Sequence, residues 1–362
     1  MALLAVLLLF AGSCGSSSSN AQGGILDNPI GVAYLNGYLY VTNANYDLSG
    51  KGQGFLLVID ARAAVHDTPR NAAVVGKRTT SPYLADLTLD PDRQLAYIAS
   101  RKDDEVIVMD ISDPTDPQVV DQDPDAAGIQ NLPAGHEPNS VALRPDGRYL
   151  YVANNGGGNV SVVDLESKKL ARSISLKGGL LDIVMQPGAD YAWVTNRRTN
   201  TISLIDTVAN DFAASFTPIE AGAALLTDTR GIAFTPDGTK AYIAVQTPAL
   251  LLDVDTARLP DHPESAVVSY IPMRSVPYGV ALSPDGTECW VTNFGRERVL
   301  IIDTRIDQVV GRVGVGKSPT SLVTVHFEED DPTQYYVFVT DFRSHTLAII
   351  DGLTRTELGW IQ

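Results

Sequence analysis

A β-rich unit recurs along the whole chain and limits the folds available to it. The clearest copy runs from Pro138 to Leu176 and holds four short segments rich in Val, Ile, Leu, Tyr and Ser. Turn residues such as Pro145-Asp146-Gly147 separate these segments, which predicts strands that pair in antiparallel order. A single four-stranded sheet cannot bury both of its faces, so each copy needs another copy to pack against.

Seven copies of this unit account for nearly all of the chain. They are Pro29–Gly76, Ala85–Val120, Pro138–Leu176, Leu181–Thr217, Arg230–Met273, Tyr278–Val315 and Thr320–Gln362. A period of about 42 to 54 residues without a helical pattern is typical of blades arranged around an axis. The sequence therefore predicts an all-β fold, a seven-bladed β-propeller with four antiparallel strands per blade. The last copy is expected to supply all four of its own strands.

Two short markers recur at equivalent places in the copies. The second segment ends in Tyr40-Val41-Thr42-Asn43 and in close variants of it, such as Trp193–Asn196 and Trp290–Asn293. The third segment is expected to close on an aspartate that accepts backbone N–H groups at a turn. These aspartates are Asp60, Asp110, Asp164, Asp206, Asp253, Asp303 and Asp351.

These repeats resemble the YVTN-repeat family of seven-bladed β-propellers, which includes lactonase-like and surface-layer proteins. The resemblance covers about Asn28 to Gln362 and implies the propeller fold for residues 28–362. It leaves the function open, because the family includes both enzymes and binding scaffolds.

The N-terminal residues have features of an exported lipoprotein. The apolar run Ala2–Ala11 is too short to span a bilayer, so residues 1–13 are interpreted as a signal peptide. The sequence ending at Cys14 resembles a bacterial lipobox, which implies a lipidated cysteine followed by a flexible tether over residues 14–27. No Lys or Arg precedes the apolar run, and a plain secretory signal is the alternative. We expect an extracytoplasmic protein anchored to the cell envelope, with Gly15 favouring the outer membrane.

Charge and motifs exclude several classes of function. The formal net charge of −16 disfavours nucleic acid as a partner. The chain has no P-loop, HExxH, CxxC, CxxCH or GxSxG motif, so we expect no cofactor. If Cys14 carries lipid, Cys289 is the remaining cysteine, and its place in a strand indicates a small core residue.

One acidic stretch has the spacing of a calcium loop. Asp121, Asp123 and Asp125 alternate as Ca²⁺ ligands do, but the later Gly and Glu of such loops are missing. A solvated acidic loop is therefore preferred over a Ca²⁺ site. The surrounding segment, Asp121–Gly135, is expected to link the second and third blades.

In an up-and-down blade, the loops between second and third strands share one face with the linkers into each first strand. We call this the upper face. Its loops and linkers carry Arg197, Arg198, Arg230, Arg296 and Arg343. These arginines predict recognition of a small anionic ligand or a protein partner, with solvated loop charges as the alternative.

The openings of the first strands are expected to converge near the axis. Asp86, Asn139, Asp182, Arg230 and Tyr278 come from these openings, and His136 arrives just before one of them. A carboxylate or His136 there could act as a general base on a sugar lactone, with Asp86, Asp182 and His136 as the catalytic candidates. Small residues at a crowded axis provide the competing, purely structural interpretation.

Three functions remain open. The preferred one is a lipid-anchored, non-catalytic propeller that binds a partner or ligand outside the cytoplasm. The second is a lactonase-like hydrolase at the axis, and the third is an accessory subunit of a surface complex.

Overall fold

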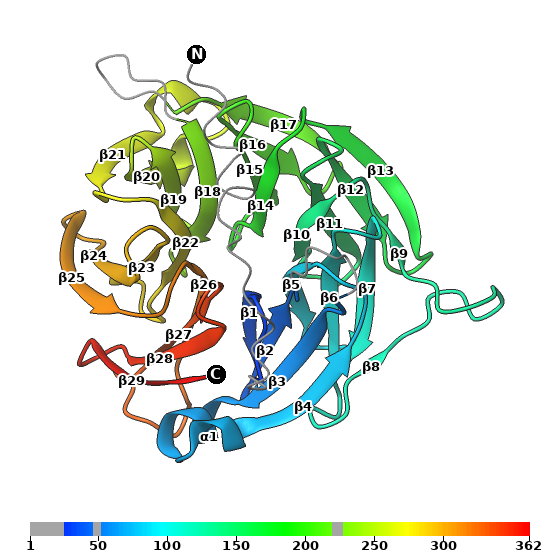
Figure 1. The fold of residues 1–362 in the computed structure, drawn as a ribbon. Helices are drawn as coiled ribbons and strands as arrows, with labels where there is room; N and C mark the ends of the chain where they lie inside the picture. The colour runs from blue at the N-terminus through cyan, green and yellow to red at the C-terminus, as the bar shows by residue number, and fades with distance from the viewer. Residues whose placement is uncertain (1–24, 46–51, 219–226) are drawn as a thin grey trace, which may run out of the picture.

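The computed structural model describes residues 25–45, 52–218 and 227–362, and it confirms the seven-bladed β-propeller (Figure 1). Each blade is an antiparallel sheet whose strands follow one another in sequence order from the axis outwards. The predicted signal peptide and the predicted lipidation site Cys14 lie outside the described residues. Within the described part of the chain, no helix has the length and apolar character needed to cross a bilayer.

The blades are numbered along the chain. The first four contain β1 (Pro29–Leu35), β2 (Tyr38–Asn43), β3 (Phe55–Asp60), β4 (Val74–Thr79); β5 (Leu84–Asp90), β6 (Leu95–Ser100), β7 (Glu105–Asp110), β8 (Gln118–Val119), β9 (Leu132–Pro133); β10 (Pro138–Leu143), β11 (Tyr149–Asn154), β12 (Asn159–Asp164), β13 (Lys169–Ser175); and β14 (Leu180–Met185), β15 (Tyr191–Asn196), β16 (Thr201–Asp206), β17 (Asp211–Phe216).

The last three blades follow the same order. They contain β18 (Thr227–Phe234), β19 (Lys240–Thr247), β20 (Leu250–Asp255), β21 (Val267–Pro272); β22 (Pro277–Leu282), β23 (Glu288–Asn293), β24 (Arg298–Asp303), β25 (Gln308–Gly314); and β26 (Pro319–Val325), β27 (Tyr336–Asp341), β28 (Thr346–Asp351), β29 (Thr356–Ile361). The short helices are α1 (Ala61–His66), η2 (Arg70–Ala73), η3 (Thr256–Arg258) and η4 (Pro263–Ser265).

The core lies between the blades. Seven apolar clusters each combine side chains of two neighbouring sheets, including one that joins blades seven and one. The second and third strands of each blade are buried along almost their whole length, because both faces of each sheet are covered. Cys289 is fully buried in the cluster between blades five and six, which confirms its core position, and burial raises the pKa of its thiol.

Among the described residues, no strand is shared between blades seven and one, as expected from the last repeat. The described strands of blade seven are β26 to β29, and its contact with blade one is made by side chains. Thr340 Oγ1 donates to the Ile30 carbonyl at 2.9 Å, and Arg70 Nη2 donates to the Leu358 carbonyl at 2.7 Å. Leu26 is also buried in this contact, so packing begins slightly before the expected start at Asn28.

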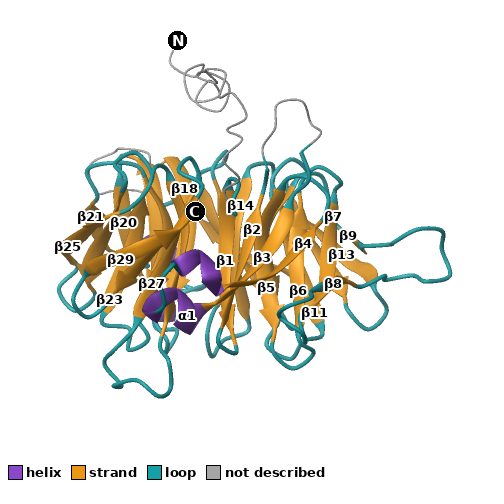
Figure 2. Cartoon of the chain, turned by 60° about the horizontal axis from the view of Figure 1, so that its bottom comes forward, coloured by secondary structure: helices purple, strands orange, loops and turns teal. Residues whose placement is uncertain are grey.

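The acidic excursion differs from its expected place. It interrupts the outer strand of blade two, since β8 and β9 both pair with β7, and it projects outwards from the side of the disc (Figure 2). Asp121 Oδ1 accepts the N–H groups of Asp123 and Gln130, at 3.1 and 3.0 Å. Over the described ranges, no group of three or more His, Cys, Asp or Glu side chains could hold a metal ion, and Asp121, Asp123 and Asp125 are no exception.

The turn aspartates behave as predicted, except in blade five. Asp60 Oδ1 accepts the Ala63 N–H at 2.9 Å, and Asp206 Oδ1 accepts the Val208 N–H at 2.8 Å. In blade five the strand register places Asp255, not Asp253, at this position, and Asp255 accepts the Ala257 N–H. The assignment of Asp253 to the turn is therefore wrong by two residues, and Asp253 occupies a buried core position instead.

Candidate functional site

Every innermost strand carries a β-bulge close to its start. The register shifts between Pro29 and Val32 in blade one, and it shifts at the corresponding place in the other six blades. A bulge turns side chains and backbone N–H groups away from their regular directions. The backbone is crowded here, because a Cβ on Gly279 would lie 2.3 Å from the Thr320 carbonyl oxygen. This explains the small residues at the strand openings.

On one side of the axis, the threonine of the recurring Val-Thr-Asn marker ties neighbouring blades together. Thr42 Oγ1 accepts the Gly31 N–H of its own blade at 2.9 Å and donates to the Ala85 carbonyl of blade two at 2.6 Å. Thr340 makes the same pair of contacts from blade seven to blade one, and Thr292 makes them from blade six to blade seven. The threonine therefore has a structural role that its spacing alone did not reveal.

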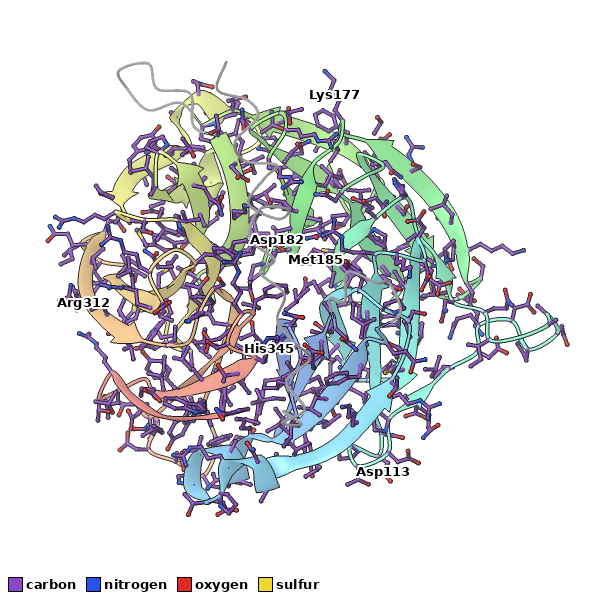
Figure 3. All side chains as sticks on the ribbon, viewed as in Figure 1. Asp113, Lys177, Asp182, Met185, Arg312 and His345 are labelled. Atoms are coloured by element: carbon purple, nitrogen blue, oxygen red, sulfur yellow. The ribbon has the colours of Figure 1, made fainter. Side chains whose placement is uncertain are left out.

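On the other side, two carboxylates span the blades. Ser140 Oγ of blade three lies 2.7 Å from Asp86 Oδ2 of blade two and 3.1 Å from Asp182 Oδ1 of blade four. Asp182 Oδ2 accepts the Ile232 N–H of blade five at 2.9 Å. Figure 3 places Asp182 on its inner strand close to the axis, whereas Arg312 and Lys177 lie at the periphery. The predicted convergence of Asp86 and Asp182 is thus present, with Ser140 between them.

The protonation of this pair follows from its surroundings. Burial, and then the charge of Asp182, raise the pKa of Asp86 to about 7. Burial also raises the pKa of Asp182. A single serine proton cannot satisfy two ionised carboxylates, so the arrangement favours one protonated acid near neutral pH.

Above these acids, arginines from several blades gather on the upper face. Arg230 is 7% exposed, and it pairs with Asp228 at 2.9 Å. Its guanidinium also lies over the Tyr278 ring, 4.9 Å from the centroid, and Tyr278 stacks on Phe294 at 5.7 Å. The sequence predicted the meeting of Arg230 and Tyr278 but gave no role to Asp228 or Phe294.

Arg197 is the exceptional member of this group. It is partly buried, and within the described chain its side chain forms no hydrogen bond or ion pair. Burial, followed by the positive charge of Arg230, lowers its pKa, and Arg101 of blade two lowers it further. Arg101 itself contacts Glu137 at 3.3 Å. We call Arg101, Arg197 and Arg230 the axial arginine cluster.

The other candidates are not drawn into one site. His136 is exposed and binds Asp104 through Nδ1 at 3.0 Å, which raises its pKa, so the structure does not pair it with Asp86 or Asp182. Asn139 Nδ2 donates to the Leu181 carbonyl at 2.6 Å and joins blades three and four.

Three of the predicted arginines point elsewhere. Arg198 packs against Gly178 and Gly179, and Arg296 is exposed on a loop of blade six. Arg343 lines a groove between blades six and seven.

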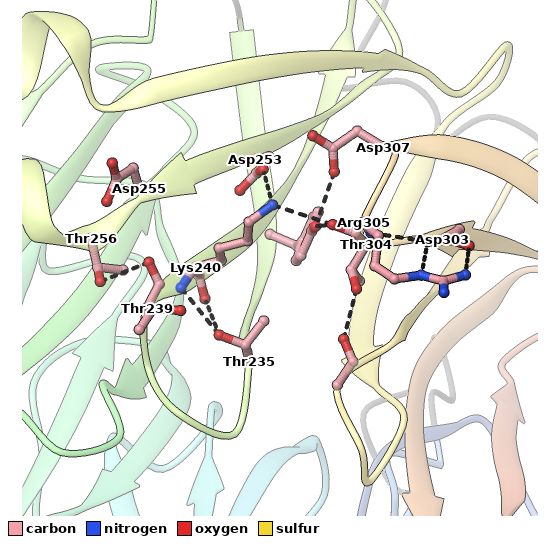
Figure 4. A network of polar contacts seen from close by, with 12 residues as sticks. Thr235, Thr239, Lys240, Asp253, Asp255, Thr256, Asp303, Thr304, Arg305 and Asp307 are labelled. Carbon is pink, nitrogen blue, oxygen red and sulfur yellow. Dashed lines mark hydrogen bonds and ion pairs between the residues drawn. The ribbon is translucent and has the colours of Figure 1, made fainter.

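A second buried polar network lies between blades five and six. Lys240 Nζ donates to Asp253 Oδ2 at 2.7 Å and to the Thr304 carbonyl at 3.2 Å, while the Tyr242 hydroxyl donates to Asp307 at 3.1 Å (Figure 4). Burial raises the pKa of Asp253 despite the Lys240 ammonium. Its groups already bond to one another across the blades, so we interpret the network as an inter-blade contact rather than a ligand site.

Comparisons with known proteins agree with the architecture. A family model described as lactonase, 7-bladed beta-propeller, matches residues 59–173, which include Asp86, His136 and Ser140. The solved structure of Kuenenia stuttgartiensis hydrazine synthase is similar, with a TM-score of 0.70 and 18% identity over 92% of this chain and 98% of that chain. At this identity the likeness shows the fold alone. No curated protein matches the sequence. The expected resemblance to lactonase-like seven-bladed propellers is confirmed.

Proposed function

We propose that this propeller is a non-catalytic binding protein that holds an anionic group in the axial arginine cluster. The observation that carries the proposal is the unpaired, partly buried guanidinium of Arg197 beside Arg230 and Arg101. Gathering like charges away from water is unfavourable, and a bound carboxylate, phosphate or sulfate would remove that cost. Arginine is suited to this role because its planar donors bind such groups in pairs.

The nearby aromatic rings define the rest of the ligand. Tyr278 and Phe294 stack beside Arg230, so an apolar portion next to the anion would find a flat surface. A small organic acid or an acidic side chain of a protein partner fits this combination. A partner protein bound here would make the chain an accessory subunit.

The proposal is tested with two anions, gluconate and inorganic phosphate, by calorimetry on the purified protein. We expect saturable binding of at least one anion, weakened at least tenfold in Arg197→Gln and less in Arg197→Lys. Arg305→Gln, which removes an exposed arginine paired with Asp303, serves as the matched control and keeps full affinity. If neither anion binds, or if Arg197→Gln binds as well as the wild type, the axial arginine cluster is not the site.

Envelope anchoring through Cys14 belongs to the same proposal, and its support is the N-terminal sequence alone. Labelling of cells with an alkyne-bearing fatty acid should mark the wild-type protein and leave Cys14→Ser unmarked. Fractionation then distinguishes the outer membrane from other parts of the envelope. Release of wild-type protein as a soluble, unlabelled species would contradict lipid anchoring.

A lactonase-like hydrolase is the second candidate, favoured by Asp86, Ser140 and Asp182 together with the family match over residues 59–173. A carboxylate with a pKa of about 7 could serve as a general base at neutral pH. However, both acids lie within hydrogen-bond distance of Ser140 Oγ and accept backbone N–H groups, which suits a structural tie.

Hydrolysis of glucono-δ-lactone above the buffer rate, lost in Asp86→Asn with folding intact, would establish the enzyme. A rate equal to that of buffer supports the binding protein.

A further inference from the structure

A groove of about 830 Å³ lies between the outer strands of blades six and seven, away from the axial arginine cluster. It is lined by β25, the link from β25 to β26, the loop between β27 and β28, and β29. Its volume falls within the range of small-molecule sites. None of its residues takes part in the proposed axial site, so the inference below is independent of that proposal.

The groove concentrates positively charged side chains, three of which form no ion pair within the described residues. Arg312, Lys317 and Arg343 line it, and within the described residues none of these side chains forms a hydrogen bond or ion pair. Arg355, also in the lining, is already paired with Glu288, and Glu357 is the one acid among the described residues that line the groove. In a chain with a net charge of −16, three unpaired cations in one groove favour an anionic ligand.

An exposed indole lies in the same groove. Trp360 is 51% exposed, whereas Trp193 and Trp290 are completely buried in the core. A large aromatic face left open to water is a common mark of a binding surface. Hydroxyl and amide side chains also line the groove, from Ser344, Thr346 and Gln362.

From this combination, we infer that the groove binds a short acidic saccharide. The apolar C–H face of a sugar ring stacks on the Trp360 indole, and the sugar hydroxyls bond to the neighbouring hydroxyl and amide groups. The sugar carboxylates or sulfates pair with Arg312, Lys317 and Arg343, as arginine and lysine do with such anions. A neutral sugar would form no ion pair with these three cations, and a small inorganic anion would not cover the Trp360 indole.

Trp360 supplies an internal reporter for the test. Because the other two tryptophans are buried, a ligand-induced change in tryptophan fluorescence reports on the groove. The full-length protein is titrated with trigalacturonate, with maltotriose as the neutral comparison, and with inorganic phosphate and ADP as anions lacking the saccharide. Calorimetry gives the affinities of the variants, including those that alter the fluorophore.

We expect trigalacturonate to bind saturably and at least tenfold more tightly than maltotriose, phosphate or ADP. The double variant Arg312→Gln/Arg343→Gln loses at least tenfold in affinity, and Trp360→Ala loses a similar factor. Trp360→Phe, which keeps an aromatic ring, retains most of the affinity while the fluorescence change disappears. Lys169→Gln, on the outer strand β13 of blade three, is the matched control and binds as the wild type does.

Each of the other results overturns the proposal. Equal affinity for maltotriose and trigalacturonate would show that the cations are not used, and tighter binding of ADP would identify phosphate chemistry instead. An absence of any response to millimolar trigalacturonate would show that the groove is not a saccharide site. Correct folding of each variant is verified by its unfolding transition.

Discussion

The inner strands are joined by different chemistry on the two sides of the axis. From blade six through blade one, threonine hydroxyls bridge each blade to the next. In blades two and three, alanine takes the threonine position, at Ala99 and Ala153, and the bridge passes through Asp86, Ser140 and Asp182 instead. A hydroxyl tie is neutral at every ordinary pH, whereas a carboxylate tie responds to pH. The bridges on the second side therefore respond to pH, whereas the threonine bridges on the first side do not.

The sign of this pH response is set by the direction of the pKa shift. The pKa of Asp86 rises from 3.8 to about 7 on folding. Between these values the folded state holds a proton that the unfolded state has lost, so the free energy of unfolding falls as pH increases. Ionisation of the buried Asp86 therefore lowers the free energy of unfolding by its full amount only above about pH 7.

The largest expected effect is on this pH dependence. Between pH 5 and pH 8, the free energy of unfolding should fall by about 2 kcal/mol less in Asp86→Asn than in the wild type. The full pKa shift of Asp86 sets an upper limit of about 4 kcal/mol on this difference. Urea unfolding at the two pH values measures it. A decrease that is the same in both proteins would show that Asp86 does not titrate in this range.

A buried acid also lies on the side of the axis where threonine hydroxyls bridge the blades, and it tests whether stability on that side is independent of pH. Asp341 ends β27, where blades one, three, four and six have Asn43, Asn154, Asn196 and Asn293. It is completely buried, its Oδ1 has no hydrogen-bond partner among the described residues, and burial raises its pKa to about 7.

Asp341→Asn places an amide where the ionised oxygen lacks a donor. We expect a gain of about 2 kcal/mol in unfolding free energy at pH 8 and little change at pH 5. Thermal or urea unfolding of the single variants and of Asp86→Asn/Asp341→Asn measures this, and the two effects should add. A destabilisation at pH 8 would mean that Asp341 is held by contacts that need its charge.

The smallest expected change in stability comes from removing one of the threonine hydroxyls that bridge neighbouring blades. Thr340→Val keeps the shape of the side chain but leaves the Ser321 N–H and the Ile30 carbonyl without this partner. We expect a loss of about 1 to 2 kcal/mol in unfolding free energy that is equal at pH 5 and pH 8. Thr340→Ser retains the hydroxyl and serves as the control. A loss that changes with pH would remove the distinction between the two sides.

The sequence was sufficient for the fold because the repeat itself encodes the architecture. Seven copies with apolar second and third segments can bury those segments only between neighbouring sheets. The strand-opening pattern also brought Asp86 and Asp182 together correctly. The assignment of Asp253 failed because spacing cannot show that β20 ends two residues later than its counterparts.

The contacts that define the site could not be predicted in the same way. The bridge through Ser140 depends on how a bulge turns this side chain toward the neighbouring blades. The pairing of His136 with Asp104 depends on how the segment before β10 lies against the turn between β6 and β7. Arg197 and Arg343 are both loop arginines in the sequence, yet Arg197 belongs to the axial arginine cluster and Arg343 lines a groove between blades six and seven. Only the three-dimensional arrangement separates them.

The contiguity of each blade has a consequence for how the ring assembles and opens. Every sheet can form from neighbouring residues as they leave the ribosome, and only the junction between the first and the last sheet must wait for the complete chain. In the part of the chain that the structure describes, no strand crosses that junction, which relies on apolar packing and on hydrogen bonds such as those of Thr340 and Arg70. We expect the contact between blades seven and one to be the first inter-blade contact that separates under mechanical force or heating.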